Sequence, residues 1–83
     1  MTAGSKALEK IKANPGRVVT WTELCAIMKH LGYEIKQRSG SRTAFFHPKT
    51  KRIHMFHKPH PGDELVVGAR LEFINILQDL REL

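Results

Sequence analysis

The fold of this 83-residue chain is decided by residues 33–62, which read YEIKQRSGSRTAFFHPKTKRIHMFHKPHPG. Along this stretch charged and uncharged side chains alternate, which is the period of two typical of half-buried β-strands. Two short segments rich in serine, glycine, proline and lysine interrupt the alternation and supply turns. The sequence therefore predicts a meander of three antiparallel strands over residues 33–38, 42–47 and 52–58.

The alternation also predicts which side chains share a face of the sheet. In the second strand Thr43 and Phe45 lie on one face, and the opposite face carries Arg42, Ala44 and Phe46. The third strand has apolar side chains on both faces, so its pattern leaves the inward face open. The two alternatives are Ile53, Met55 and His57 on one side, and His54, Phe56 and Lys58 on the other.

The segment before the strands predicts a helix that begins after Thr20. Thr20 and Glu23 form a T-x-x-E capping box, in which each side chain accepts a hydrogen bond from the other residue's backbone N–H. Gly32 suits the left-handed turn that closes a helix. The single cysteine, Cys25, is expected to be a buried or half-buried structural residue. The apolar residues at helical spacing are Trp21, Leu24, Ile27, Met28 and Leu31.

Two further helices are expected. The first is capped by Ser5 and ends before Pro15, because proline cannot continue the hydrogen-bond ladder. The last begins near Val67 or Gly68, and its expected apolar residues are Val67, Leu71, Ile74, Leu77 and Leu80. The predicted fold is α+β, with an α-β-β-β-α core and the helices on one face of the sheet. The single domain is divided into a helical extension, residues 1–18, and the core, residues 19–83.

The positive charge is concentrated in the middle of the chain. The whole sequence has a net charge of +6, but residues 29–58 hold eight Lys or Arg and one acid, Glu34. This segment therefore carries +7 and the remaining residues −1. Such an asymmetry favours a polyanionic partner, nucleic acid above all. The alternative is a basic surface that is merely solvated.

The sequence predicts no membrane partner. No apolar run approaches the roughly 20 residues that cross a bilayer, and residues 1–10 lack the apolar region of a secretory signal. A single cysteine cannot form an internal disulfide, so the reducing cytoplasm is the expected location.

Histidines are the candidate proton carriers. His54, His57 and His60 have the spacing H-x-x-H-x-x-H, but residues three apart on a strand point to opposite faces, so no metal site is predicted. No dinucleotide or Walker fingerprint is present, and no cofactor is expected. Breaking RNA without a metal needs a base, an acid and cations, and imidazole suits the proton steps. His57 and His60 are the best-placed carriers, the alternative being ordinary surface histidines.

Three motifs in this order resemble the HicA-type toxins, the YcfA/HicA family of small bacterial mRNA interferases. They are the helix ELCAIMKHLGYE at residues 23–34, the G-S-x-x-x-[FY]-x-H-P segment at 40–48, and H-P-G-x-E-L at 60–65. The resemblance covers roughly Thr22 to Leu80. It implies a double-stranded-RNA-binding-like α-β-β-β-α fold, endoribonuclease activity on mRNA without a metal, and neutralisation by a HicB-type antitoxin.

One position departs from the family pattern. The residue after Gly-Ser is usually the catalytic histidine, and here it is Arg42. A guanidinium stays protonated and cannot act as a base, but it clamps phosphate well. One alternative is that His57 or His60 takes the proton role while Arg42 binds phosphate. A second is that the protein binds RNA without cutting it efficiently. A third is that the basic face mainly binds an acidic antitoxin. The residues expected to contact RNA are Lys36, Arg38, Gly40, Ser41, Phe46 and Lys58.

Overall fold

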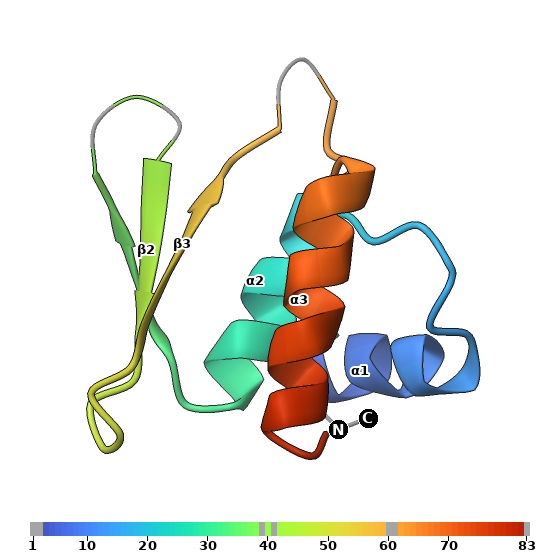
Figure 1. Ribbon diagram of the computed structural model, residues 1–83, viewed down its shortest axis with the longest axis horizontal. Coiled ribbons are helices and arrows are strands. Elements are labelled where there is room, and N and C mark those ends of the chain that lie inside the picture. Colours follow the sequence, from blue (N-terminus) through green and yellow to red (C-terminus); the bar gives the residue numbers. More distant parts are fainter. Residues whose placement is uncertain (1–2, 39, 41, 60–61, 83) are drawn as a thin grey trace.

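The computed structural model describes residues 3–38, 40, 42–59 and 62–82. Its elements, in chain order, are α1 (Ala3–Ala13), α2 (Trp21–His30), β1 (Glu34–Gln37), β2 (Arg42–Phe46), β3 (Ile53–His57) and α3 (Val67–Asp79). The strands form one antiparallel sheet in the order β1-β2-β3. Figure 1 shows this sheet at one side of the molecule and the three helices at the other. The expected α+β fold with a three-stranded meander is confirmed.

A series of contacts between aromatic rings connects the sheet with α2 and α3. The ring of Trp21 meets Phe45 edge to face at 5.8 Å, Phe45 meets Phe56 at 5.7 Å, and Phe56 meets Phe73 of α3 at 6.5 Å between centroids. Such edge-to-face pairs contribute beyond the area they bury. Phe56 is 3% exposed, whereas Ile53 is 59% exposed. The inward face of β3 is therefore the one that carries Phe56.

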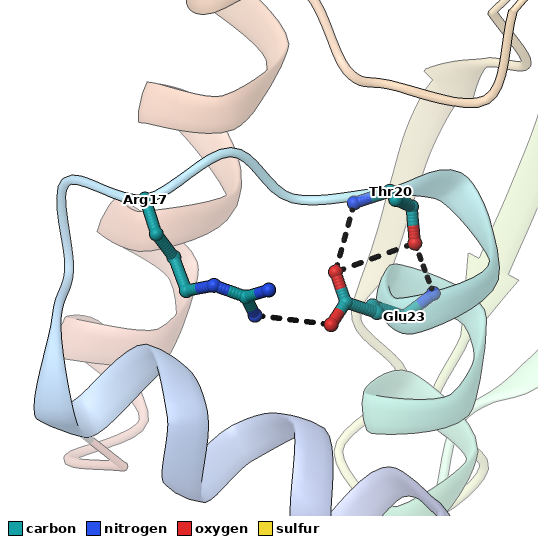
Figure 2. A network of polar contacts seen from close by, with 3 residues as sticks. All are labelled: Arg17, Thr20 and Glu23. Atoms are coloured by element: carbon teal, nitrogen blue, oxygen red, sulfur yellow. Dashed lines mark hydrogen bonds and ion pairs between the residues drawn. The ribbon is translucent and has the colours of Figure 1, made fainter.

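The start of α2 has the predicted capping box, drawn in Figure 2. The Thr20 hydroxyl accepts from the Glu23 backbone N–H at 3.2 Å, and the Glu23 carboxylate accepts from the Thr20 backbone N–H at 3.1 Å. Arg17 Nη1 lies 3.0 Å from the other carboxylate oxygen. Partial burial raises the pKa of Glu23, but these hydrogen bonds and the Arg17 charge outweigh burial, so its pKa lies below the usual range. Gly32 closes the helix with a φ of 94°.

The first helix packs on α2. It begins at Ala3, so Ser5 lies inside its first turn instead of capping it. Its buried side chains Ala7, Leu8 and Ile11 join the same apolar core as α2 and the sheet. Because α1 is short and polar, this burial supplies the stability that its sequence lacks.

The buried face of α3 differs from the one its sequence predicts. Ile74 and Leu77 are buried as expected, but Val67 and Leu71 are 62% and 53% exposed. Phe73 and Ile76 are buried alongside Ile74 and Leu77. The helix carries apolar residues on overlapping stripes, so spacing alone does not determine which stripe faces the core. Within the described part of the chain, no helix has the length and apolar character to cross a membrane.

Candidate nucleic-acid interface

The sheet surface turned away from the helices, called the open face below, is built from the outward residues of all three strands. The pairing register sets them in three rows across the sheet. The first row is Arg38, Arg42 and His57, the second is Lys36, Ala44 and Met55, and the third is Glu34, Phe46 and Ile53. Alternation along each strand keeps these side chains on the solvent side.

Arg42 and His57 are direct register partners on β2 and β3. Side chains of such a pair leave neighbouring positions on the same face, roughly 5 Å apart at Cβ. Arg38 extends the row, because its backbone N–H donates to the Arg42 carbonyl at 2.8 Å. Both Arg42 and His57 are exposed. This row therefore places two guanidinium groups and one imidazole along one end of the open face.

The open face is basic at one end and apolar at the other. Lys36 and the two arginines are exposed, and Glu34 is the one acid in the three rows. Lys51, in the turn after β2, has its Nζ 5.9 Å from the centroid of the Phe46 ring, within cation–π range. Ile53 and Met55 add exposed apolar surface next to Phe46. Cations flanking exposed apolar groups are the composition of a nucleic-acid surface.

A hollow of about 220 Å³ lies on the open face. Ala44 is 2% exposed although it belongs to this face, because larger side chains surround its single methyl group. Around Ala44, the residues that line the hollow are Lys36, Arg38, Phe46 and Ile53. The small side chain at the centre of β2 therefore creates a depression where its neighbours are long.

The structure separates the predicted RNA-contacting residues into two groups. Lys36, Arg38 and Phe46 lie together on the open face with Arg42 and His57. Gly40 and Lys58 instead line a cavity of about 170 Å³ on the helix side of the sheet, together with Trp21, Ile35, Gln37 and Thr43. Lys58 follows His57 directly, and alternation turns it to the other face. Ser41 and His60 lie outside the described residues.

The other two histidines of this region support the fold. His47 Nδ1 accepts hydrogen bonds from the backbone N–H groups of Lys49 and Thr50, each at 3.2 Å, and so holds the β2–β3 turn. Its ring packs edge-on against Tyr33 at 5.0 Å. His54 points inward, 5.7 Å from the Tyr33 ring. Burial, assisted by the Arg52 charge, lowers the pKa of His54, which favours its neutral form.

Sequence reasoning did not assign Ala44, Lys51 and Ile53 to the interface. Ala44 shares the alternation of Arg42 and Phe46, so that pattern could have identified it. To place Ile53 on this face, one needs the pairing of β2 with β3. To place Lys51 near Phe46, one needs the geometry of the turn, in which Lys51 has a φ of 63°.

Cys25 is half-buried as expected, and burial raises the pKa of its thiol. Among the described residues, no three His, Cys, Asp or Glu side chains gather as metal ligands.

A comparison with family models connects this architecture with a known class of protein. The model described as HicA toxin of bacterial toxin-antitoxin matches residues 21–77. Searches of curated proteins and of solved structures give no match. The matched range runs from the first residue of α2 through the whole sheet to Leu77 of α3, which covers every described residue of the open face. The chain belongs to the HicA toxin family of bacterial toxin–antitoxin systems.

Proposed function

We propose that this toxin binds mRNA on the open face and cleaves it as an endoribonuclease. The observation that carries the proposal is the register pair Arg42–His57 on an exposed basic surface. An imidazole can exchange a proton near neutral pH, whereas a guanidinium stays charged and binds phosphate. The pair thus supplies a proton carrier next to a phosphate clamp, which are two of the groups that RNA cleavage requires.

In the proposed reaction, His57 accepts the proton of a ribose 2′-hydroxyl. The 2′-oxygen attacks the adjacent phosphorus, the bond to the 5′-oxygen breaks, and that oxygen takes up a proton. The products are a 2′,3′-cyclic phosphate and a 5′-hydroxyl. Arg42 and Arg38 stabilise the negative charge that builds on the phosphate. The acid that protonates the leaving oxygen is predicted to be His60.

The partner antitoxin is proposed to be of the HicB type, acting in the cytoplasm. An acidic segment of such a partner would be attracted to the same basic open face as RNA, since both carry negative charge. Neutralisation would then follow from direct competition for Arg38, Arg42 and Lys36. If this face serves mainly the antitoxin, the free toxin will bind RNA weakly at every salt concentration.

A second candidate function is RNA binding without cleavage. The observation in its favour is Arg42, which stands where the family motif has a histidine. A guanidinium cannot take the hydroxyl proton, so a toxin that lacks a replacement base would act by covering mRNA. This candidate predicts salt-sensitive RNA binding with intact RNA.

The deciding experiment incubates end-labelled RNA with the free protein in EDTA, so that adventitious metal ions do not contribute. Wild-type protein is compared with His57→Ala, His60→Ala and Arg42→Gln. Loss of a general acid or base costs about 10²–10⁴-fold in rate, and we expect a loss of this size for His57→Ala. His30→Gln, at the end of α2, is the matched control. Intact RNA with wild-type protein that still binds RNA would leave the non-cleaving function in place.

A further inference from the structure

The hollow on the open face has the size of a site for one small ring system. Its volume of about 220 Å³ is several times the roughly 30 Å³ of a water molecule. It is smaller than the roughly 300–1,000 Å³ of sites for drug-sized ligands. The hollow is therefore too large for a structural water and too small for an extended molecule.

The walls of the hollow combine an aromatic ring with two cations. Phe46 and Ile53 supply apolar surface at one end, and Lys36 and Arg38 supply positive charge along the side. Ala44, with its single methyl, contributes the one small side chain. A flat aromatic ring attached to a phosphodiester matches this combination, because the ring can stack on Phe46 while the phosphate contacts the cations.

We propose that this hollow is a pocket for one unpaired nucleobase, and that the toxin consequently selects single-stranded over double-stranded RNA. The proposal rests on RNA binding by the open face, argued above. In a duplex the bases are stacked and paired, and the surface that reaches a protein is mostly phosphate and ribose. A duplex can meet the cations of the open face, but it has no base to place against Phe46.

The position of Lys51 supports the same assignment. Its ammonium lies 5.9 Å from the Phe46 ring, so a nucleotide whose base contacts Phe46 would have a further cation within reach of its phosphate. Lys36 and Arg38 line the hollow on the β1 side, and the Lys51 ammonium lies over the Phe46 ring. The phosphates on both sides of the inserted base would meet positive charge.

The test measures binding of a fluorescent RNA of about 12 nucleotides, a length within the range that single-strand sites cover. The RNA is fully 2′-O-methylated, so cleavage cannot affect the result. It is titrated as a single strand and as a duplex with its complement. We expect the single strand to bind about tenfold more tightly, which lies within the range of about 5- to 150-fold that stacking of one base contributes.

Two variants change the pocket and leave its charges intact. Phe46→Leu removes the aromatic ring, and Ala44→Leu fills the hollow from its centre. Each should weaken single-strand binding about tenfold with the duplex affinity and the salt dependence unchanged. Phe46→Tyr keeps the ring and is the matched control. Thermal melting of each variant verifies that it folds, and a 2-aminopurine base in the strand reports stacking directly through fluorescence quenching.

The outcomes separate this inference from the proposed function. Equal affinity for both RNAs, unchanged by Phe46→Leu, would overturn the base pocket and leave RNA binding by the open face standing. Absence of binding to either RNA at low salt would overturn both. Tighter binding of the single strand, lost in Phe46→Leu and retained in Phe46→Tyr, is the result that we expect.

Discussion

Gly4 of α1 packs directly on the backbone of Ala26 in α2. A Cβ atom at position 4 would overlap the Ala26 carbonyl oxygen and lie 2.7 Å from Cβ of His30. A helix backbone cannot move aside as a flexible side chain can. The two helices therefore approach as closely as they do because residue 4 has no side chain.

Gly4→Ala should lower the free energy of unfolding by about 1–3 kcal/mol, the usual cost of forcing extra volume into a packed contact. The matched control is Gly68→Ala in α3, where an added Cβ meets nothing within 4 Å. There we expect no loss, and a gain of up to about 1 kcal/mol from the better helix propensity of alanine. Urea unfolding of the three proteins measures both values. Equal stability of Gly4→Ala and wild type would refute the close contact.

The capping box of α2 should be measurable in the same way. Thr20→Ala removes the acceptor for the Glu23 backbone N–H and should cost about 1 kcal/mol. Thr22→Ala is the control, since its hydroxyl bonds Asp63 at the exposed surface and should cost less. A Thr20→Ala protein as stable as wild type would mean that the helix end gains nothing from this cap.

His54 should make the stability of the protein depend on pH. Burial, followed by the Arg52 charge, lowers its pKa below the usual 6.5, while Glu72 and Asp79 act in the opposite direction. The unfolded chain therefore binds a proton at a higher pH than the folded chain does. The contribution of His54 is complete above about pH 6.5 and is lost as the pH falls through the folded pKa.

The corresponding experiment follows urea unfolding between about pH 7.5 and about pH 5. His54→Gln cannot take up the proton and should lose less stability over this range than wild type. Parallel profiles for wild type and His54→Gln would contradict the assignment.

The two faces of the sheet should differ in their effect on RNA. Arg42→Gln and Lys36→Gln, both on the open face, should weaken binding and reduce the slope of log affinity against log salt by about 0.7 each for a single strand. Lys58→Gln should leave that slope unchanged, because Lys58 lines the cavity on the helix side. An equal change for Lys58→Gln would extend the interface around the end of the sheet.

Local signals in the sequence predicted the elements of the fold. The Thr20–Glu23 box begins α2, and Gly32 ends it with a positive φ, because both depend on residues close together in the chain. The faces of β2 followed from alternation for the same reason. For β3, apolar residues lie on both sides, and only packing against Phe45 and Phe73 selects Phe56 as the inward one.

The sequence predicted the positive charge of the candidate site, but it did not predict the hollow. Lys36, Arg38 and Arg42 were expected on one surface, and they lie together there. The hollow exists because Ala44 lies between longer side chains of β1 and β3. The pairing register of the strands determines which side chains these are. In hairpins the register is set by turn type and loop length, and the sequence pattern located the turns without defining their types. Lys58 was expected to contact RNA, and in the structure it lines the cavity on the helix side of the sheet.

The alternation of β2 has a consequence for how such a toxin can diversify. Thr43 and Phe45 face the core, whereas Arg42 and Phe46 face solvent, although all four are consecutive or nearly so in the chain. Substitutions at an outward position that is exposed, such as Arg42, leave the core packing untouched and should change stability little. Single substitutions of exposed residues on the open face can therefore change what this surface binds. The core packing, and with it the fold, stays the same.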